Sequence, residues 1–320
     1  MGEEIGEQGE SKLSYSSYLR LHELLSLQSG QTGNTRNISS DELHFIIVHQ
    51  NFELWFKLVI NELTCTRDIL SSEYVEETKL PQAVHHMVRV IETFKLMSQQ
   101  WRVMETLEPQ DFLNFRDELG TASGFESFQM REMEALMGSK WIDGKLAGKP
   151  GSGKSLYDVT CDWLERTPIQ GSVYTSKDDE TQVNMFIDEY LEAHRKLYPD
   201  TNKEAVQFFE EEQSLRRRRA GLVFIESYRA LPLLAWPRKL ISTLIELEQS
   251  MILWRTSHAR MVERMIGRRI GTGGSSGVDY LDMTTKYRVF IDLWAVRSIL
   301  IKKEALPVLK NKDFYEFRGE

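Results

Sequence analysis

His49 is the first residue whose type and position could do chemistry. It lies in residues 39–63, SSDELHFIIVHQNFELWFKLVINEL, where Phe45, His49, Phe52 and Phe56 repeat at the spacing of one helix face. An imidazole among three aromatic rings has two interpretations: a buried structural histidine that donates to a backbone carbonyl, or a polar group above a flat aromatic ligand. This stretch by itself leaves both open.

His258 is the second such residue. It follows Met251 and Trp254 on one face of a predicted helix in SMILWRTSHARMVERMIGRRI, and Met261 continues that face. A helical bundle with two such histidines can hold a haem, with one histidine on the iron and the other across from it. A lone helical histidine is more often structural, so the spacing leaves this choice open as well.

Arg116 lies among phenylalanines in the stretch DFLNFRDELGTASGF, with Phe112 four residues before it. A guanidinium in such surroundings needs a partner, and its fork of donors suits the carboxylate of a ligand. The alternative is an internal ion pair with Asp111, Asp117 or Glu118. The residues alone permit either.

Two glycine-rich loops could bind anions. Residues 271–277, GTGGSSG, offer hydroxyls and amides to an anionic or zwitterionic ligand, although such a loop can also simply end a helix. Residues 148–155, GKPGSGKS, match the phosphate-loop pattern, which requires a buried strand directly before it. The preceding SKWIDGKLA is no such strand, so we expect a mobile loop over residues 142–155. A nucleotide-binding enzyme, disabled by Lys154→Ala, is the remaining alternative.

Composition and charge are those of a globular protein. The 320 residues are 41% hydrophobic and 28% charged, and their net charge of −8 argues against nucleic-acid binding, which needs a basic surface. One basic run, residues 216–219 (RRRR), follows the acidic run 210–212 (EEE). This pattern predicts a solvated helix face with internal charge pairing.

The cysteines and the apolar runs bear on location. Cys65 and Cys161 are too few for a disulfide framework and too far apart for a CxxC-type metal site. The N-terminal MGEEIGEQGESK has no apolar run like that of a signal peptide, and no apolar run reaches membrane-spanning length. We therefore expect a cytoplasmic protein that does not contact membranes.

The hydrophobic pattern predicts helices along almost the whole chain. The expected helices cover residues 14–27, 39–70, 81–107, 155–166, 179–198, 202–228, 239–266 and 280–301. Because residues 39–63 are apolar almost all round, their helix is expected in the middle of a bundle. Residues 1–13 are predicted to be a disordered leader, and residues 14–310 a single all-α domain, a helical bundle with a smaller helical lobe.

Four motifs resemble one known family. HFIIVHQNFELWFK, FRDELGTASGF, the WRTSH helix and GTGGSSG, in this order, are similar to the tryptophan 2,3-dioxygenase family, and SYSSYLRLHELL resembles its N-terminal segment. The resemblance spans roughly residues 14–300. It implies an all-α fold around haem b, with ferrous iron in the active form. The implied reaction inserts O2 across the indole C2=C3 bond of L-tryptophan to give N-formylkynurenine, the first step of tryptophan degradation by the kynurenine pathway.

The resemblance also implies roles for the residues introduced above. His258 would be the proximal ligand of the haem iron, and His49 the distal histidine near the indole N–H of the substrate. Arg116 would bind the substrate carboxylate, with Thr272 near the ammonium and carboxylate groups.

Further residues would complete the site by the same resemblance. Phe45 and Phe112 would line the indole pocket. The expected haem contacts are Ser123, Gly124 and Trp254. Tyr15 and Tyr18 would reach into the pocket of a neighbouring subunit, so a homotetramer is expected.

The sequence departs from the family's pattern in a few places. The segment after GTGGSSG is shorter, Glu126 replaces a usual glutamine, Phe52 replaces a usual tyrosine, and residues 142–155 are unlike the family's loop. One alternative is therefore a related haem enzyme that oxygenates a substituted tryptophan or indole in a biosynthetic pathway. Another is a non-catalytic haem sensor, against which Arg116 argues, because a gas sensor needs no carboxylate clamp.

Overall fold

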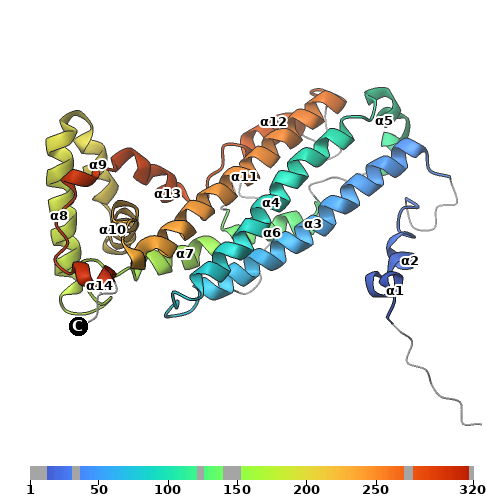
Figure 1. Cartoon of the computed structure of the whole chain (residues 1–320). Coiled ribbons are helices and arrows are strands. Elements are labelled where there is room, and N and C mark those ends of the chain that lie inside the picture. Colours follow the sequence, from blue (N-terminus) through green and yellow to red (C-terminus); the bar gives the residue numbers. More distant parts are fainter. Residues whose placement is uncertain (1–12, 31–36, 121–125, 140–152, 270–276, 317–320) are drawn as a thin grey trace, which may run out of the picture.

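The chain is all-α wherever its structure is described. The computed structural model describes residues 13–30, 37–120, 126–139, 153–269 and 277–316, and these residues form helices with no strand among them (Figure 1). The all-α prediction is confirmed. Nearly all of the predicted leader (residues 1–13) and most of the predicted loop (residues 142–155) lie outside the described residues. None of the described helices is both long and apolar enough to cross a membrane. The cytoplasmic location stays a prediction.

Three long helices lie side by side and form the body of the molecule: α3 (Ser40–Leu70), α4 (Leu80–Met104) and α11 (Ala235–Ile266) (Figure 1). Shorter helices pack around them: α5 (Pro109–Arg116), α6 (Phe128–Met137), α7 (Leu156–Glu165) and α12 (Gly277–Thr284). Single-turn 3-10 helices cover Asp117–Leu119, Pro199–Thr201, Pro232–Leu234 and Lys303–Ala305. Two of the long helices, α3 and α11, carry His49 and His258, so both histidines project from regular helices rather than from loops.

Helix α3 begins where the sequence predicted. The Ser39 hydroxyl accepts a hydrogen bond from the Glu42 amide at 3.0 Å and so caps the helix. The helix is not surrounded on all sides in the single chain, however, because Leu43, Ile47 and Leu54 are 37%, 42% and 49% exposed. The expectation of a helix fully enclosed by its own bundle is wrong, and one apolar face of α3 remains uncovered.

A second group of helices forms the smaller lobe at the other end of the molecule (Figure 1): α8 (Asp179–Leu197), α9 (Asn202–Phe209), α10 (Gln213–Ser227) and α14 (Lys312–Glu316). The expected single helix over residues 202–228 is wrong, because the chain turns between α9 and α10. Arg219 stabilises this turn by donating a hydrogen bond of 2.8 Å to the Phe208 carbonyl, one of the unpaired carbonyls at the end of α9.

The arginines of residues 216–219 do not form a solvated face. Arg217 is only 6% exposed and pairs with the buried Asp179, with 3.0 Å between Nη2 and Oδ1. Arg219 pairs with Asp292, 2.9 Å from Nη2, and only secondarily with Glu211. The run was predicted to pair within one helix, but its main partners lie elsewhere in the sequence.

The C-terminal segment is also less regular than predicted. In place of one helix over residues 280–301, the structure has α12, an irregular stretch, α13 (Ile291–Ala295) and a 3-10 turn (Val296–Ile299). The buried carboxylate of Glu248 holds the irregular stretch, because it accepts the amides of Val289 and Phe290 and, at 2.5 Å, the indole N–H of Trp294. These side-chain bonds replace backbone bonds of a continuous helix.

We expect Glu248→Gln to lower the free energy of unfolding by about 2 to 3 kcal/mol. The amide nitrogen of glutamine cannot accept a hydrogen bond, so at least one of the buried N–H groups that now donate to the carboxylate would lose its partner. Denaturant unfolding measures this change. Glu246→Gln is the control, since Glu246 lies two residues away in sequence and its exposed pair with Lys95 contributes little. Equal losses in the two variants would contradict the role of Glu248.

The N-terminal segment forms two short helices, α1 (Tyr15–Leu19) and α2 (Leu21–Leu24), which stand apart from the bundle beyond the start of α3 (Figure 1). The predicted helix over residues 14–27 is interrupted at Arg20, whose φ of 50° is left-handed. Two hydrogen bonds connect this segment to Gln50 of α3. The side-chain amide of Gln28 donates to the amide oxygen of Gln50, and the amide nitrogen of Gln50 donates to the Leu27 carbonyl oxygen.

Candidate active site

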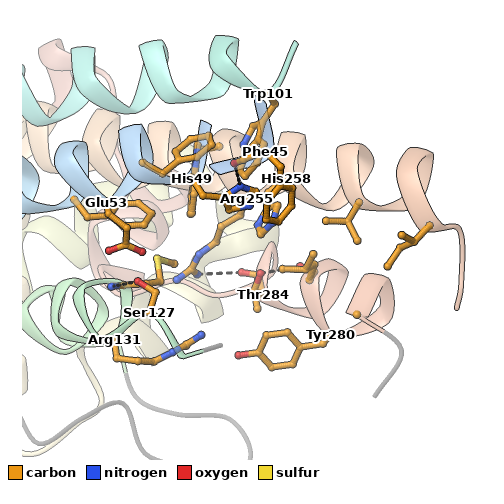
Figure 2. Close-up of a pocket in the computed structure, with 18 of the residues that line it drawn as sticks. Phe45, His49, Glu53, Trp101, Ser127, Arg131, Arg255, His258, Tyr280 and Thr284 are labelled. Atoms are coloured by element: carbon orange, nitrogen blue, oxygen red, sulfur yellow. Dashed lines mark hydrogen bonds between the residues drawn. The ribbon is translucent and has the colours of Figure 1, made fainter. Parts of the chain in front are cut away.

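A cavity of about 310 Å³ lies in the bundle and is lined by side chains of α3, α4, α5, α6, α11 and α12. Its walls are mostly apolar and aromatic, with a few polar groups that converge on it (Figure 2). Its size is at the lower end of the range for small-molecule sites, about 300 to 1,000 Å³. The cavity brings together six of the site residues predicted from the sequence: His49, Arg116, His258, Phe45, Phe112 and Trp254.

His49 projects from α3 into this cavity. Its Nδ1 lies 2.8 Å from the Phe45 carbonyl oxygen, which can only accept, so Nδ1 carries the proton and donates. Removal of the ring from bulk solvent lowers the pKa of His49, and the imidazole is neutral near pH 7. Its Nε2 therefore keeps a lone pair that can accept a hydrogen bond. His49 thus bonds a backbone carbonyl and also lines the cavity. Its place above a flat aromatic ligand stays a prediction.

His258 reaches the same cavity from α11. Burial is the main cause that lowers the pKa of His258 to about 3, with a smaller contribution from His49, so the ring is neutral. Its plane lies parallel to that of Trp101, at 4.5 Å between ring centroids. Within the described part of the chain neither ring nitrogen makes a hydrogen bond. A neutral imidazole with an available nitrogen is what a haem iron requires of an axial ligand.

Aromatic rings form the wall beside His49. The ring of Phe45 lies 4.0 Å from that of His49 and 5.8 Å from that of Phe112, between centroids. Arg116, the last residue of α5, lines the cavity next to Phe112. This side of the cavity thus pairs a flat apolar surface with a cation, the combination that an aromatic amino acid would need.

Trp254 and Trp101 also line the cavity, with ring centroids 6.2 Å apart. Trp254 was expected from the sequence, whereas Trp101 was not, because its place on α4 gave no motif. The sequence prediction also missed Arg131, Glu134 and Arg255, which line the cavity. The position of Arg255, three residues before His258 on one helix face, was a signal that could have indicated it.

The structure does not place the other predicted site residues at this cavity, for two different reasons. Tyr15 and Tyr18 on α1 are 76% and 70% exposed and do not line it within their own chain. Ser123, Gly124 and Thr272 lie outside the described residues. Their roles stay predictions.

Comparison with known proteins identifies the family. The family model of tryptophan 2,3-dioxygenase matches residues 2–300. The chain belongs to the tryptophan 2,3-dioxygenase family. It is 39% identical to the tryptophan 2,3-dioxygenase 2 of Ralstonia nicotianae, over 96% of this chain and 98% of the relative. It is 40% identical to the tryptophan 2,3-dioxygenase of Sorangium cellulosum, over 96% of this chain and 88% of the relative. With that of Anopheles gambiae it shares 32% identity, over 95% and 89%.

Membership in the tryptophan 2,3-dioxygenase family confirms the resemblance drawn from the four motifs. It makes the chain an oxidoreductase of the dioxygenase class, in a family that is haem-dependent. The cavity fits a haem in its chemistry, because it offers a neutral histidine with an available nitrogen, a second histidine, and aromatic walls. The described residues contain no group of three or more His, Cys, Asp or Glu side chains that could bind a bare metal ion.

Proposed function

We propose that this protein is a haem-dependent dioxygenase that converts L-tryptophan and O2 to N-formylkynurenine, the first step of the kynurenine pathway. The observation that carries the proposal is the placement of His49 and His258, from two helices far apart in sequence, at one aromatic-lined cavity with Arg116 in its wall. Family membership supports the same conclusion.

His258 would hold the haem through one ring nitrogen, with Trp101 and Trp254 packed beside it. When bound, the haem supplies the iron at which O2 is activated. The surrounding apolar side chains exclude water and so limit the escape of reactive oxygen species. Ser123 and Gly124 would contribute at the edge of the haem.

The substrate would be held by groups at both of its ends. The guanidinium of Arg116 would bind the carboxylate, with Thr272 near the ammonium group, while Phe45 and Phe112 lie against the indole ring. Nε2 of His49 would accept a hydrogen bond from the indole N–H. These contacts fix C2 and C3 of the indole relative to O2, which is a positioning effect.

The overall reaction balances without a base. Both atoms of O2 add to the substrate, at C2 and C3, and the bond between these carbons breaks. No net proton is gained or lost. His49 therefore has no need to remove a proton, and its role is to orient the indole.

His49→Ala is expected to lower kcat/KM for L-tryptophan by about 10-fold, the effect of losing one buried hydrogen bond to the substrate. Steady-state turnover measures this change. 1-Methyltryptophan is the matched substrate, because it has no indole N–H to donate. If the substitution lowers turnover of both substrates equally, His49 does not act through this hydrogen bond.

We also propose that the chain assembles as a homotetramer, in which Tyr15 and Tyr18 enter the cavity of a neighbouring subunit. The exposure of both tyrosines on α1, a helix that stands apart from the bundle, supports this. So does the uncovered apolar face of α3. The long helices α4 and α11 also have exposed apolar side chains: Leu96, Val103 and Leu253. Analytical ultracentrifugation of the haem-loaded protein tests the assembly, and a monomer would contradict it.

Turnover of a substrate panel tests the proposed function. The purified, haem-loaded and reduced protein is given air with L-tryptophan, with ring-substituted tryptophans, or with indole, and the products are identified by mass spectrometry. N-Formylkynurenine from L-tryptophan supports the proposal. Product only from a substituted tryptophan or from indole would indicate the biosynthetic relative, and bound haem without any product would indicate a sensor.

A further inference from the structure

A buried chain of charged side chains joins three helices at the edge of the cavity. Glu134 on α6 accepts a hydrogen bond of 2.8 Å from Nη2 of Arg255 on α11 and one of 2.6 Å from Nη1 of Arg131. Nη1 of Arg255 donates to the carbonyl oxygen of Thr284, the last residue of α12, at 3.2 Å. All four residues line the cavity that His258 enters, and Arg255 extends from the His258 helix toward Thr284 (Figure 2).

The position of Arg255 makes this group of linked charged side chains important for the site. Arg255 is 5% exposed and lies about one turn before His258 on the same helix, so its bonds act close to the expected haem ligand and are little screened by solvent. Among the described residues, the ion pair between α11 and α12 is at the surface. The side chains of this pair, Arg260 and Asp282, are 50% and 43% exposed, so it holds the helices only weakly.

Stability alone does not account for the buried pair. Taking two charges out of water costs about as much as their attraction returns, and apolar side chains of similar size would often serve stability as well. In addition, Nε of Arg255 is buried and makes no hydrogen bond among the described residues. What the pair does provide is fixed geometry, because one carboxylate and one carbonyl define where the guanidinium must lie.

We propose that Glu134 and Arg255 are positioning residues that hold α6 and α12 at fixed places relative to the helix of His258, and so set the width of the cavity. This inference rests on the proposed function, since it concerns the haem and tryptophan site. Helix α6 contributes Met130 and its N-cap residue Ser127 to the cavity, and α12 contributes Tyr280. A shift of either helix would therefore move a wall of the site.

The smaller lobe contains a matched pair for comparison. Arg217 donates to Asp179 from Nη2 at 3.0 Å and from Nε at 3.2 Å, and to the Thr167 carbonyl oxygen from Nη2 at 2.7 Å. Like Arg255, it is a buried arginine shared between a carboxylate and a backbone carbonyl. None of these three residues lines the cavity of His258. Asp179→Asn thus repeats the chemical change of Glu134→Gln at a site away from the cavity.

The experiment compares the haem-loaded wild type with Glu134→Gln and Asp179→Asn. The rate of haem transfer to excess apomyoglobin, KM and kcat for L-tryptophan, and hydrogen–deuterium exchange of the α12 amides are measured. We expect Glu134→Gln to lose haem about 10-fold faster, as is typical when a supporting residue of a metal site is changed. Its KM should rise more than its kcat falls, and its α12 amides should exchange faster. Asp179→Asn should leave all three measurements near the wild-type values.

Haem loss, KM and α12 exchange that are no different in Glu134→Gln and Asp179→Asn would overturn the positioning role while leaving the proposed function intact. A wild type that binds no haem would instead overturn the proposed function. If Glu134→Gln does not fold, Arg255→Lys replaces it, with Arg217→Lys as its control. A lysine keeps the charge beside Glu134 but cannot also reach Thr284, so haem loss about 3-fold faster is expected for Arg255→Lys alone. Equal rates in the two lysine variants would overturn the proposal.

Discussion

His258→Ala is expected to abolish both haem retention and turnover. The imidazole is the neutral, cavity-facing group with an available nitrogen on α11, and alanine offers the iron no ligand. The purified variant should lack the absorbance of a histidine-ligated haem and form no N-formylkynurenine. Because the same substitution also leaves space beside Trp101, the fold of the variant is checked by circular dichroism.

His194→Ala is the control for this prediction. His194 is also a buried histidine on a long helix, only 1% exposed, but it belongs to the smaller lobe and bonds Asn202. This variant is expected to be less stable yet to keep its haem and its activity. If His258→Ala retained haem with an unchanged spectrum, or if His194→Ala lost it equally, His258 would not be the axial ligand.

Arg116→Met is expected to lower kcat/KM for L-tryptophan by about 100-fold or more. A guanidinium that binds a carboxylate through two charge-assisted hydrogen bonds contributes about 3 kcal/mol, and each 1.4 kcal/mol is a factor of ten. Methionine keeps much of the side chain's apolar volume beside Phe112, so the substitution removes mainly the charge. Steady-state kinetics measures the effect, and haem content should not change.

Tryptamine separates carboxylate binding from other effects of this substitution, because it has the indole and the ammonium group of tryptophan but no carboxylate. The wild type should prefer L-tryptophan over tryptamine strongly, and Arg116→Met should lose most of that preference. Arg102→Met, on an exposed position of α4, is the control for loss of a positive charge. If Arg116→Met kept the full preference for L-tryptophan, Arg116 would not bind the carboxylate.

The long helices could be predicted from the sequence because their hydrophobic pattern is sustained over many turns. Helix α3 was placed at Ser40–Leu70 almost to the residue, since Ser39 is a strong cap. The shorter C-terminal elements could not be predicted, because Glu248 imposes an irregular stretch through bonds to residues about 40 positions away in sequence. A periodicity argument is local and does not contain such a contact.

The apolar face of α3 shows a second limit of the same kind. A helix that is apolar all round can be covered by its own chain or by another chain, and the two cases have the same sequence pattern. The structure distinguishes them, because Leu43, Ile47 and Leu54 are exposed in the single chain. What covers this face is a matter for the assembly experiment above.

Some residues of the candidate site could be predicted from the sequence and others could not. His49, Arg116 and His258 could be found because each lies in a distinctive motif. Trp101 and Glu134 could not, since their importance comes from their spatial neighbours: Trp101 stacks on His258 and Glu134 pairs with Arg255. The packing of the helices determines which residues become such partners, and this packing cannot be predicted from the local sequence pattern.

The central claim is that the protein inserts both atoms of O2 into L-tryptophan. Its most direct test is to supply the haem-loaded, reduced protein with L-tryptophan and ¹⁸O2 and to measure the mass of the product by mass spectrometry. The account predicts N-formylkynurenine that carries two ¹⁸O atoms, since both atoms of O2 enter the substrate at C2 and C3. A product with a single ¹⁸O atom, even after correction for exchange of the formyl and ketone oxygens with water, would contradict it and indicate a monooxygenase.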